Sequence, residues 1–201
     1  MIRVLLAEDQ RLVRGALLAL LSFEEDIVVV ADVSRGDDAI AAALTATPDI
    51  ALLDIEMPGQ DGIAVARRLR AELPACRSII LTTFSRPGFL RRAMESGAVG
   101  FLLKDLPARE LAHAIRRCAA GERVIDPTLA AAALADGPSP LSDREREVLS
   151  ASSEGATIAD VAAALFLSEG TVRNHLSHAI QKLAARNRTE AARIAEEKGW
   201  L

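Results

Sequence analysis

Five short apolar runs recur through the first half of the chain, separated by segments of helical periodicity. The runs are rich in Val, Ile and Leu, and their apolar residues are continuous rather than alternating. Strands buried on both faces have this pattern, and strands that alternate with helices form a parallel sheet covered on both sides. The sequence therefore predicts a five-stranded, doubly wound α/β domain over residues 1–118. The predicted strands are IRVLLA (2–7), IVVVADV (27–33), DIALLD (49–54), RSIILTT (77–83) and VGFLLK (99–104).

Helices are predicted between these runs from apolar residues at helical spacing. In the first helix, the apolar side chains from Leu12 to Leu21 fall on one face. Gly97 and Gly121 follow two of the helices, at positions where a glycine commonly ends a helix. The other four predicted helices of this domain cover residues 36–46, 61–72, 87–96 and 107–119.

The pattern changes after residue 118, and residues 119–140 are predicted to link two domains. The stretch 126–140 contains three prolines, and we interpret it as a short helix or turn followed by a linker. From residue 141 onward the chain is helical, and Ser142 with Glu145 has the spacing of a capping box. Residues 141–201 are therefore expected to form an all-α domain, with helices near 142–153, 157–165, 168–184 and 188–198.

The composition limits the class of protein. A chain of 201 residues is long enough for two domains, and its net charge of −4 gives no overall signal for nucleic acid or a membrane surface. No apolar stretch approaches the roughly 18 residues of a membrane span, and the N-terminus lacks the length of a signal peptide. Cys76 and Cys118 are too few for a disulfide framework. We expect a soluble, cytoplasmic protein without membrane contact.

Carboxylates follow two predicted strands at the edge where sheets of this kind bind ligands. With a strand order of 2-1-3-4-5, the first and third strands are neighbours, about 4.8 Å apart. Glu8 and Asp9 end the first strand, and Asp54 ends the third. Close carboxylates stay ionised when a cation joins them, and a donor set made only of oxygen suits Mg²⁺. The backbone carbonyl of Glu56 is a further candidate ligand.

The same edge carries candidate groups for phosphoryl chemistry. Mg²⁺ would neutralise an incoming phosphoryl group and assist in-line attack by Asp54, which would form an aspartyl-phosphate. Thr82 and Lys104 end the fourth and fifth strands, and each could reach a phosphoryl oxygen on Asp54; Thr83 is a rival for Thr82. Each residue alone is commonly a solvated group, but four strand ends together favour a functional site.

Several stretches of the chain resemble two-component response regulators. AEDQ, LLDIEMPGQDG, ILTTF and GAVGFLLKD resemble the receiver domain of that family. LSDREREVL, IADVAAALFLSEGTVRNHLSHAIQKL and RNRTEA resemble the helix-turn-helix of the NarL/LuxR (FixJ) class. TTFSRPGFLRRAMESGA and EKGWL are most similar to the subgroup that includes the membrane-lipid desaturase regulator. The resemblance covers the whole chain and implies a flavodoxin-like receiver domain followed by a helix-turn-helix domain.

The resemblance also implies roles for the matching residues. Asp54 would accept a phosphoryl group from a sensor histidine kinase, with Glu8 and Asp9 as the metal-holding pair. Thr82 would be the switch hydroxyl, and Lys104 would contact the phosphoryl group. The matching positions Pro58, Gly59 and Gly62 would shape a tight turn that leads into a helix.

Phe101, three residues before Lys104, would be the aromatic switch of the family. Some members have Tyr there, so this chain lacks the hydroxyl. Movement of Thr82 toward the phosphoryl group would vacate space for Phe101 to fill. In many receivers a Pro follows the lysine across a cis bond; here Asp105 follows, a cis bond would be costly, and its state is left open.

The helix predicted over 168–184 is the candidate recognition helix. Arg173, Asn174 and Ser177 lie near its N-terminal end, on the side opposite its apolar residues. A recognition helix presents such side chains to the major groove, where Arg suits guanine and Asn suits adenine. The apolar side, expected to face the core, carries Val172, Leu176, Ile180 and Leu183.

Candidates for phosphate contacts, which position a protein on double-stranded DNA without reading sequence, are Thr171, Lys182 and Arg188. The stretch TIADVA carries less positive charge than the SNKEIA-like stretch usual in the family. This difference predicts weak binding by a monomer and gives more weight to a homodimer that forms on activation and reads two half-sites.

Two other functions stay open. Asp54-Ile55-Glu56 superficially resembles the nucleophile and acid of haloacid-dehalogenase phosphohydrolases, although those enzymes have the nucleophile after the first strand. A DNA-binding regulator without phosphorylation is the other alternative, and the intact set of Asp54, Thr82 and Lys104 argues against it. The favoured function is a transcription regulator that is not an enzyme.

Overall fold

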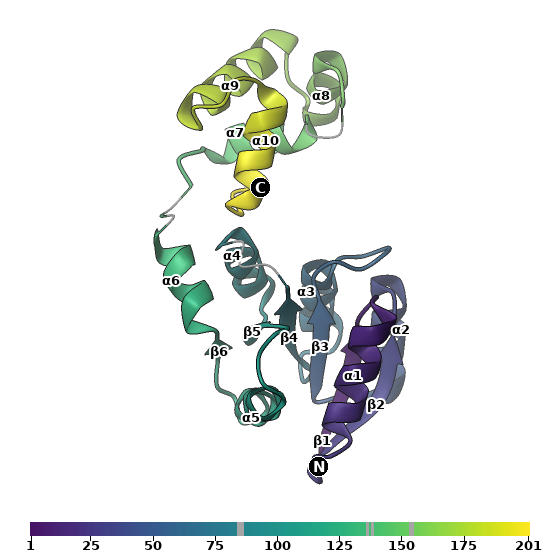
Figure 1. Ribbon diagram of the computed structural model, residues 1–201. Helices are drawn as coiled ribbons and strands as arrows, with labels where there is room; N and C mark the ends of the chain where they lie inside the picture. Colours follow the sequence, from purple (N-terminus) through teal and green to yellow (C-terminus); the bar gives the residue numbers. More distant parts are fainter. Residues whose placement is uncertain (84–86, 136, 138, 153–154) are drawn as a thin grey trace. The chain divides into compact units, whose positions relative to one another are not determined.

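The structure is a computed structural model that describes the chain except for residues 84–86, 136, 138 and 153–154 (Figure 1). The described residues form two compact units. The first comprises Met1–Ser85 and Leu90–Ala130 and contains a parallel sheet. The second comprises Arg86–Phe89 and Ala131–Leu201 and contains the last four helices. No helix in the described part of the chain is both long and apolar enough to span a membrane.

The sheet of the first unit has six parallel strands among the described residues, in the order β2-β1-β3-β4-β5-β6. The predicted α/β class and the order of the first five strands are confirmed, whereas the predicted total of five strands is wrong. The sixth strand pairs Val124 with Gly100 and Ile125 with Phe101. Two residues are too few to give a recognisable pattern, and they lie in the stretch predicted as a linker. The strands are β1 (Ile2–Ala7), β2 (Ile27–Val33), β3 (Ile50–Asp54), β4 (Arg77–Thr82), β5 (Gly100–Leu103) and β6 (Val124–Ile125).

Helices cover both faces of the sheet, as the continuous apolar strands require. One face carries α1 and α5, whose side chains Leu17, Leu111 and Ile115 pack in one core with Leu52 and Ile79 of the strands. Helices α2 and α3 pack against each other and against the strands. The helices of this unit are α1 (Arg11–Leu21), α2 (Gly36–Ala46), α3 (Gly62–Glu72), α4 (Pro87–Ser96) and α5 (Ala108–Ala119).

Two predictions from single residues hold in this unit. Gly97 and Gly121 follow α4 and α5 with φ angles of 96° and 101°, the left-handed conformation expected of glycines that end helices. Cys76 and Cys118 are free and buried. Burial raises the pKa of the Cys76 thiol to about 12, so this side chain behaves as a core residue.

The segment after β6 begins with a helix, α6 (Pro127–Ala135), in agreement with the predicted short helix or turn. Four helices then make up the second unit around a core that contains Leu149, Val172, Leu176 and Trp200. Each of the four begins at a capping side chain, and the capping box predicted at Ser142 is present. These helices are α7 (Asp143–Ala151), α8 (Ile158–Leu165), α9 (Glu169–Lys182) and α10 (Arg188–Glu197).

Candidate functional site

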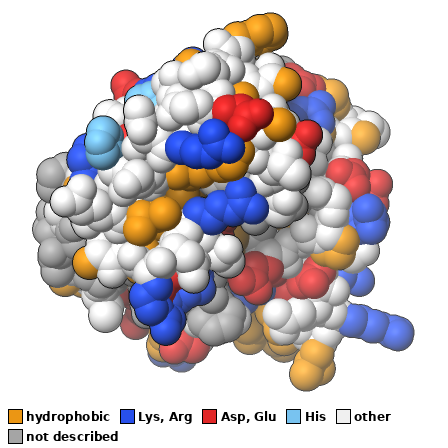
Figure 2. Space-filling view, turned by 90° about the horizontal axis from the view of Figure 1, so that it is seen from above, with side chains coloured by type: hydrophobic (Ala, Val, Ile, Leu, Met, Phe, Trp, Pro, Cys, Tyr) orange, Lys and Arg blue, Asp and Glu red, His pale blue; other side chains and the backbone are white. Residues whose placement is uncertain are grey.

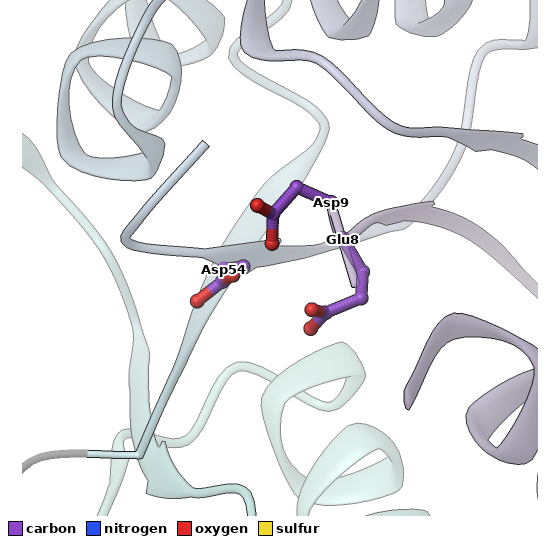
Figure 3. Close-up of side chains that lie close together, drawn as sticks. All are labelled: Glu8, Asp9 and Asp54. Carbon is purple, nitrogen blue, oxygen red and sulfur yellow. The ribbon is translucent and has the colours of Figure 1, made fainter. Parts of the chain in front are cut away.

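Three carboxylates meet at the carboxyl ends of β1 and β3 (Figure 3). The two strands are direct neighbours, with Ala7 paired to Leu53, so the residues that follow them share one edge of the sheet. Glu8, Asp9 and Asp54 each offer an oxygen within 4.8 Å of the others. Glu8 is fully buried, and Asp54 is only 3% exposed. The structure therefore brings together the three acids that the sequence singled out.

Lys104 joins this cluster from the end of β5. Its Nζ atom lies 2.7 Å from Oε2 of Glu8 and 2.9 Å from Oδ2 of Asp54, so one ammonium group bridges two buried carboxylates. The backbone N–H of Lys104 donates a hydrogen bond of 2.8 Å to the carbonyl oxygen of Thr82, which places the end of β4 beside it. Thr82 is buried and Thr83 is exposed, and this difference favours Thr82 as the hydroxyl of the site.

The protonation of Asp54 reflects this surrounding. The pKa of Asp54 is raised to about 6: burial raises it most and the charge of Glu8 adds to that effect, while the hydrogen bond and charge of Lys104 act in the opposite direction. The pKa of Lys104 is also raised: burial lowers it, but hydrogen bonds to Glu8 and Asp54 outweigh that effect. Asp54 thus has a pKa close to neutral pH, and additional positive charge nearby would favour its carboxylate form.

The donor set fits a hard divalent cation. Oδ1 of Asp9 is buried and makes no hydrogen bond to any described residue, which is uncommon for a carboxylate oxygen. The three acids offer only oxygen atoms, the donors that Mg²⁺ prefers. Glu56 lies two residues beyond Asp54 with an exposed side chain, and the role of its carbonyl oxygen as a ligand stays a prediction.

The loop that follows β3 returns close to the backbone of Asp54. A Cβ atom on Gly62 would lie 2.0 Å from the carbonyl oxygen of Asp54, so only glycine allows α3 to begin there. Gly59 has a φ angle of 84°, and Asp61 caps α3 by accepting a hydrogen bond of 2.6 Å from the N–H of Ala64. The glycines at positions 59 and 62 therefore have the conformational roles expected from the sequence.

Phe101 lies on β5, next to the edge strand β6, and is fully buried. Its neighbours across the strands are Ile80 on β4 and Ile125 on β6. The sequence did not predict the pairing of Phe101 with Ile125, because it did not predict strand β6. The peptide bond between Lys104 and Asp105 is trans, as are all peptide bonds in the described residues, which answers the question left open by the sequence.

In the second unit, α9 divides into the two faces that the sequence predicted. The candidate base-contact residues are exposed, and the apolar residues pack in the core. Ile180 is half-buried at the margin between the two faces. Figure 2 shows the face of the second unit that carries α8 and α9 in Figure 1, where Lys, Arg and His side chains lie among acidic and apolar ones. The exposed residues are Arg173, Asn174 and Ser177, and the buried ones are Val172, Leu176 and Leu183.

Two candidates for DNA contact at the start of α9 have partners within the helix. Arg173 donates a hydrogen bond of 2.8 Å to Glu169, with both side chains more than half exposed. The hydroxyl of Thr171 lies 2.9 Å from the hydroxyl of Ser168, the residue that caps the helix. Exposed pairs of this kind contribute little to stability, so both side chains remain available to a ligand.

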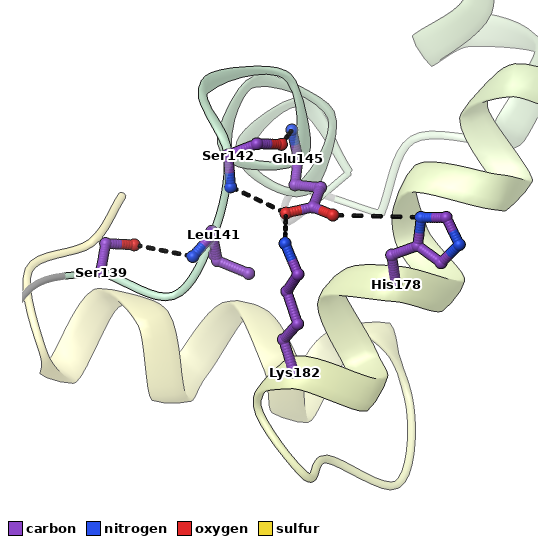
Figure 4. Close-up of polar contacts among 6 residues, drawn as sticks. All are labelled: Ser139, Leu141, Ser142, Glu145, His178 and Lys182. Carbon is purple, nitrogen blue, oxygen red and sulfur yellow. Dashed lines mark hydrogen bonds and ion pairs between the residues drawn. The ribbon is translucent and has the colours of Figure 1, made fainter.

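The other two candidates for phosphate contact are tied to neighbouring segments. Arg188 donates a hydrogen bond of 2.9 Å to the carbonyl oxygen of Ala156, just before α8. Lys182 donates one of 2.7 Å to Glu145 of α7 (Figure 4). The sequence revealed Glu145 only as part of a capping box, because no pattern links residues so far apart along the chain.

Comparison with known proteins agrees with both halves of this description. Residues 4–116 match the family model of the response regulator receiver domain, and residues 139–195 match the model of bacterial regulatory proteins of the luxR family. The chain is 49% identical over its full length and that of the relative to the uncharacterized transcriptional regulatory protein YvfU of Bacillus subtilis. It is 42% identical, with the same full coverage, to the transcriptional regulatory protein DesR of that organism.

A solved structure covers the whole chain as well. It is the crystal structure of the response regulator ChrA in a heme-sensing two-component system, with 37% sequence identity and a TM-score of 0.60. The match spans 100% of this chain and 98% of that one.

Proposed function

The chain belongs to the response regulators that join a receiver domain to a LuxR-type DNA-binding domain, and on this basis we propose that phosphorylation of Asp54 controls its binding to DNA. The observation that carries the proposal is the convergence of Glu8, Asp9 and Lys104 on Asp54. The phosphoryl donor is a sensor histidine kinase, the target is double-stranded DNA, and the protein acts in the cytoplasm, where it would meet both.

Asp54 is the phosphoryl acceptor in this proposal. A carboxylate oxygen of Asp54 attacks the phosphorus of the kinase phosphohistidine; the O–P bond forms as the P–N bond breaks, and the imidazole nitrogen keeps the electron pair. Glu8, Asp9 and Asp54, with the carbonyl of Glu56, would hold Mg²⁺, which when bound neutralises charge on the phosphoryl group. Lys104 shifts its ammonium from the carboxylate to a phosphoryl oxygen.

The signal passes from the new phosphoryl oxygens to the sheet. Thr82 donates its hydroxyl to one of them, and Phe101 moves into the space that Thr82 leaves. An inversion from mostly inactive to mostly active requires about 5.5 kcal/mol of differential stabilisation. Charge-assisted hydrogen bonds from Lys104 and Thr82 contribute to it. The activated protein forms a homodimer.

DNA recognition is assigned to α9. Arg173, Asn174 and Ser177 read base edges in the major groove, and Thr171 contacts phosphate. In a homodimer, two such helices read two half-sites, which compensates for the low positive charge of a single copy. The proposed role is regulatory rather than enzymatic: Asp54 follows the third strand of the sheet, not the first as in haloacid-dehalogenase phosphohydrolases.

The test of the receiver half is phosphorylation by acetyl phosphate, followed by intact mass spectrometry. Wild-type protein should gain the mass of one phosphoryl group in the presence of Mg²⁺ and none in the presence of a chelator. Asp54→Asn should gain none, whereas Asp38→Asn, which alters an exposed carboxylate on α2, should behave as wild type. Modification of Asp54→Asn would contradict the proposal.

The test of the DNA half is a gel shift with a duplex selected by the wild-type protein from a random library. Phosphorylated wild type should bind more tightly than unphosphorylated protein, and Asp54→Asn should show no difference after acetyl phosphate treatment. Equal binding in both states would favour the alternative of a regulator that does not depend on phosphorylation. Steady release of phosphate from small esters would instead revive the phosphohydrolase.

A further inference from the structure

Glu145 is a buried charge in the second unit, far from the acidic cluster in sequence. It lies in the first turn of α7 and is only 4% exposed. Each of its two carboxylate oxygens lies near a side chain of α9 (Figure 4). Oε2 accepts hydrogen bonds of 2.7 Å from the backbone N–H of Ser142 and from Nζ of Lys182. Oε1 lies 4.0 Å from Nδ1 of His178, one turn earlier on α9.

This arrangement links two helices at a defined register. The apolar contacts between α7 and α9, through residues such as Leu149 and Leu176, are not directional. The ion pair of Glu145 with Lys182 is directional, because its separation would leave the buried carboxylate without the ammonium group that balances its charge. Lys182 stands in the last turn of α9, between the core side of the helix and the side that carries Arg173 and Asn174.

We propose that Glu145 and Lys182 are a positioning pair that fixes the rotation of α9, so that Lys182 acts in DNA recognition without contacting phosphate. The proposal rests on the proposed function for its ligand, and it assigns Lys182 a different role from the phosphate contact expected from the sequence. The geometry supports it. The ammonium group of Lys182 points at α7, and if it moved to contact DNA, the buried carboxylate of Glu145 would lose its charged partner.

The two roles of Lys182 predict opposite results for Glu145→Gln. If the pair positions α9, Glu145→Gln weakens DNA binding by roughly tenfold, as Lys182→Met does, and the double variant is no weaker than either single one. If Lys182 contacts phosphate, Glu145→Gln frees its ammonium group and leaves binding unchanged or tighter. In that case the effects of Glu145→Gln and Lys182→Met on DNA affinity are independent of each other.

The experiment measures binding of the full-length, phosphorylated protein to the selected duplex by fluorescence anisotropy, from about 50 to 200 mM salt. The dependence of log affinity on log salt should be the same for Lys182→Met and wild type, because no phosphate contact is lost. Loss of a phosphate contact would reduce this slope by about one. Lys182→Arg should restore most of the affinity, since it keeps the charge opposite Glu145.

A matched control is Arg193→Met, which removes one positive charge from an exposed ion pair with Glu197 on α10. It should leave affinity within about twofold of wild type. A reduced salt slope for Lys182→Met, or tighter binding by Glu145→Gln, would overturn the proposal.

Two further measurements keep the result interpretable. If Glu145→Gln fails to fold, as circular dichroism would show, the salt slopes of Lys182→Met and Lys182→Arg decide between the two roles. If the wild type binds no duplex, the proposed function has failed. The pair is then judged by the coupling between Glu145→Gln and Lys182→Met in chemical unfolding, where zero coupling overturns it.

Discussion

Asp54 is the residue on which the proposed receiver function depends, and its negative charge is unfavourable in its present surroundings. It is nearly buried, next to another carboxylate, and its pKa is raised to about 6. Lys104 offsets only part of this effect. The same features that make Asp54 available for chemistry therefore reduce the stability of the unmodified protein near neutral pH.

We predict that Asp54→Asn increases the stability of the first unit near neutral pH in the presence of a chelator. A carboxyl group whose pKa is raised on folding lowers the stability of the protein as pH rises from about 4 to about 6, because over that range the unfolded state ionises while the folded state keeps its proton. The gain is at most about 3 kcal/mol. Thermal unfolding near pH 7 should show a higher midpoint for the variant, and the difference should shrink near pH 4.

The exposed Asp38→Asn is the control, with no expected change in midpoint. A lower midpoint for Asp54→Asn near neutral pH would show that its contact with Lys104 outweighs its burial.

At this scale the sequence predicted the members of the acidic site but not their electrostatic balance. Glu8, Asp9, Asp54 and Lys104 could be found because each directly follows a strand whose burial pattern is unmistakable. That Lys104 bridges Glu8 and Asp54 could not be predicted, since it depends on side-chain reach across three strands.

The helices of the second unit owe their boundaries to capping side chains. Ser142 and Thr157 each accept a hydrogen bond from the backbone N–H three positions on. The acidic side chain of that residue in turn accepts one from the backbone N–H of the cap. These interactions satisfy backbone N–H groups that a helix leaves unpaired at its start.

We expect Thr157→Ala to destabilise the second unit by about 1 kcal/mol, because the backbone N–H of Asp160 in the first turn of α8 loses the hydroxyl oxygen that accepts its hydrogen bond. Thr189→Ala is the matched control, an exposed threonine within α10 that caps nothing. Urea unfolding monitored through Trp200, the only tryptophan of the chain, would report on this unit. An equal loss in both variants would argue against the cap.

The pair of α7 and α9 should respond to acid. Burial raises the pKa of Glu145, but hydrogen bonds from Lys182 and Ser142 outweigh it and leave the pKa below its usual range. A lowered pKa contributes stability that is present above about pH 4.3 and is lost as pH falls through the folded value. Unfolding of the second unit from pH 6 toward pH 3 should therefore show a smaller decline in Glu145→Gln than in wild type.

Helices and strands could be told apart from the sequence. Burial on both faces gives a strand a continuous apolar run, whereas burial on one face gives a helix apolar residues along one side only. Boundaries of helices differed by a residue or two, as expected where ends depend on caps. Strand β6 was missed because its two residues, Val124 and Ile125, belong to the sheet only through pairing with β5.

For the molecule as a whole, β6 lies beyond residue 118, the predicted end of the first domain, which stays a prediction. The compact unit that contains β6 extends past α5 to Ala130. The N–H of Asp126 donates a hydrogen bond of 3.0 Å to the carbonyl oxygen of Phe101, and that of Val124 donates one of 2.9 Å to Val99. Residues after α5 therefore protect the edge of the sheet beside Phe101.

We predict that a fragment of residues 1–130 is more stable than a fragment of residues 1–118, by more than the value of one backbone hydrogen bond, about 1 kcal/mol. A fragment of residues 1–122, which ends before β6, is the control and should resemble the shorter one. Urea unfolding followed by circular dichroism makes the comparison. Equal stability of all three fragments would show that β6 does not contribute.

The bridge that Lys104 makes between Glu8 and Asp54 has a consequence for ion choice. Three carboxylates and one ammonium group leave two negative charges unbalanced at this edge of the sheet. A divalent ion restores electroneutrality there, a monovalent ion falls short by one charge, and a trivalent ion exceeds it. If a metal ion binds at this edge, the net charge of the four side chains therefore favours a divalent one, independently of ionic radius or hydration.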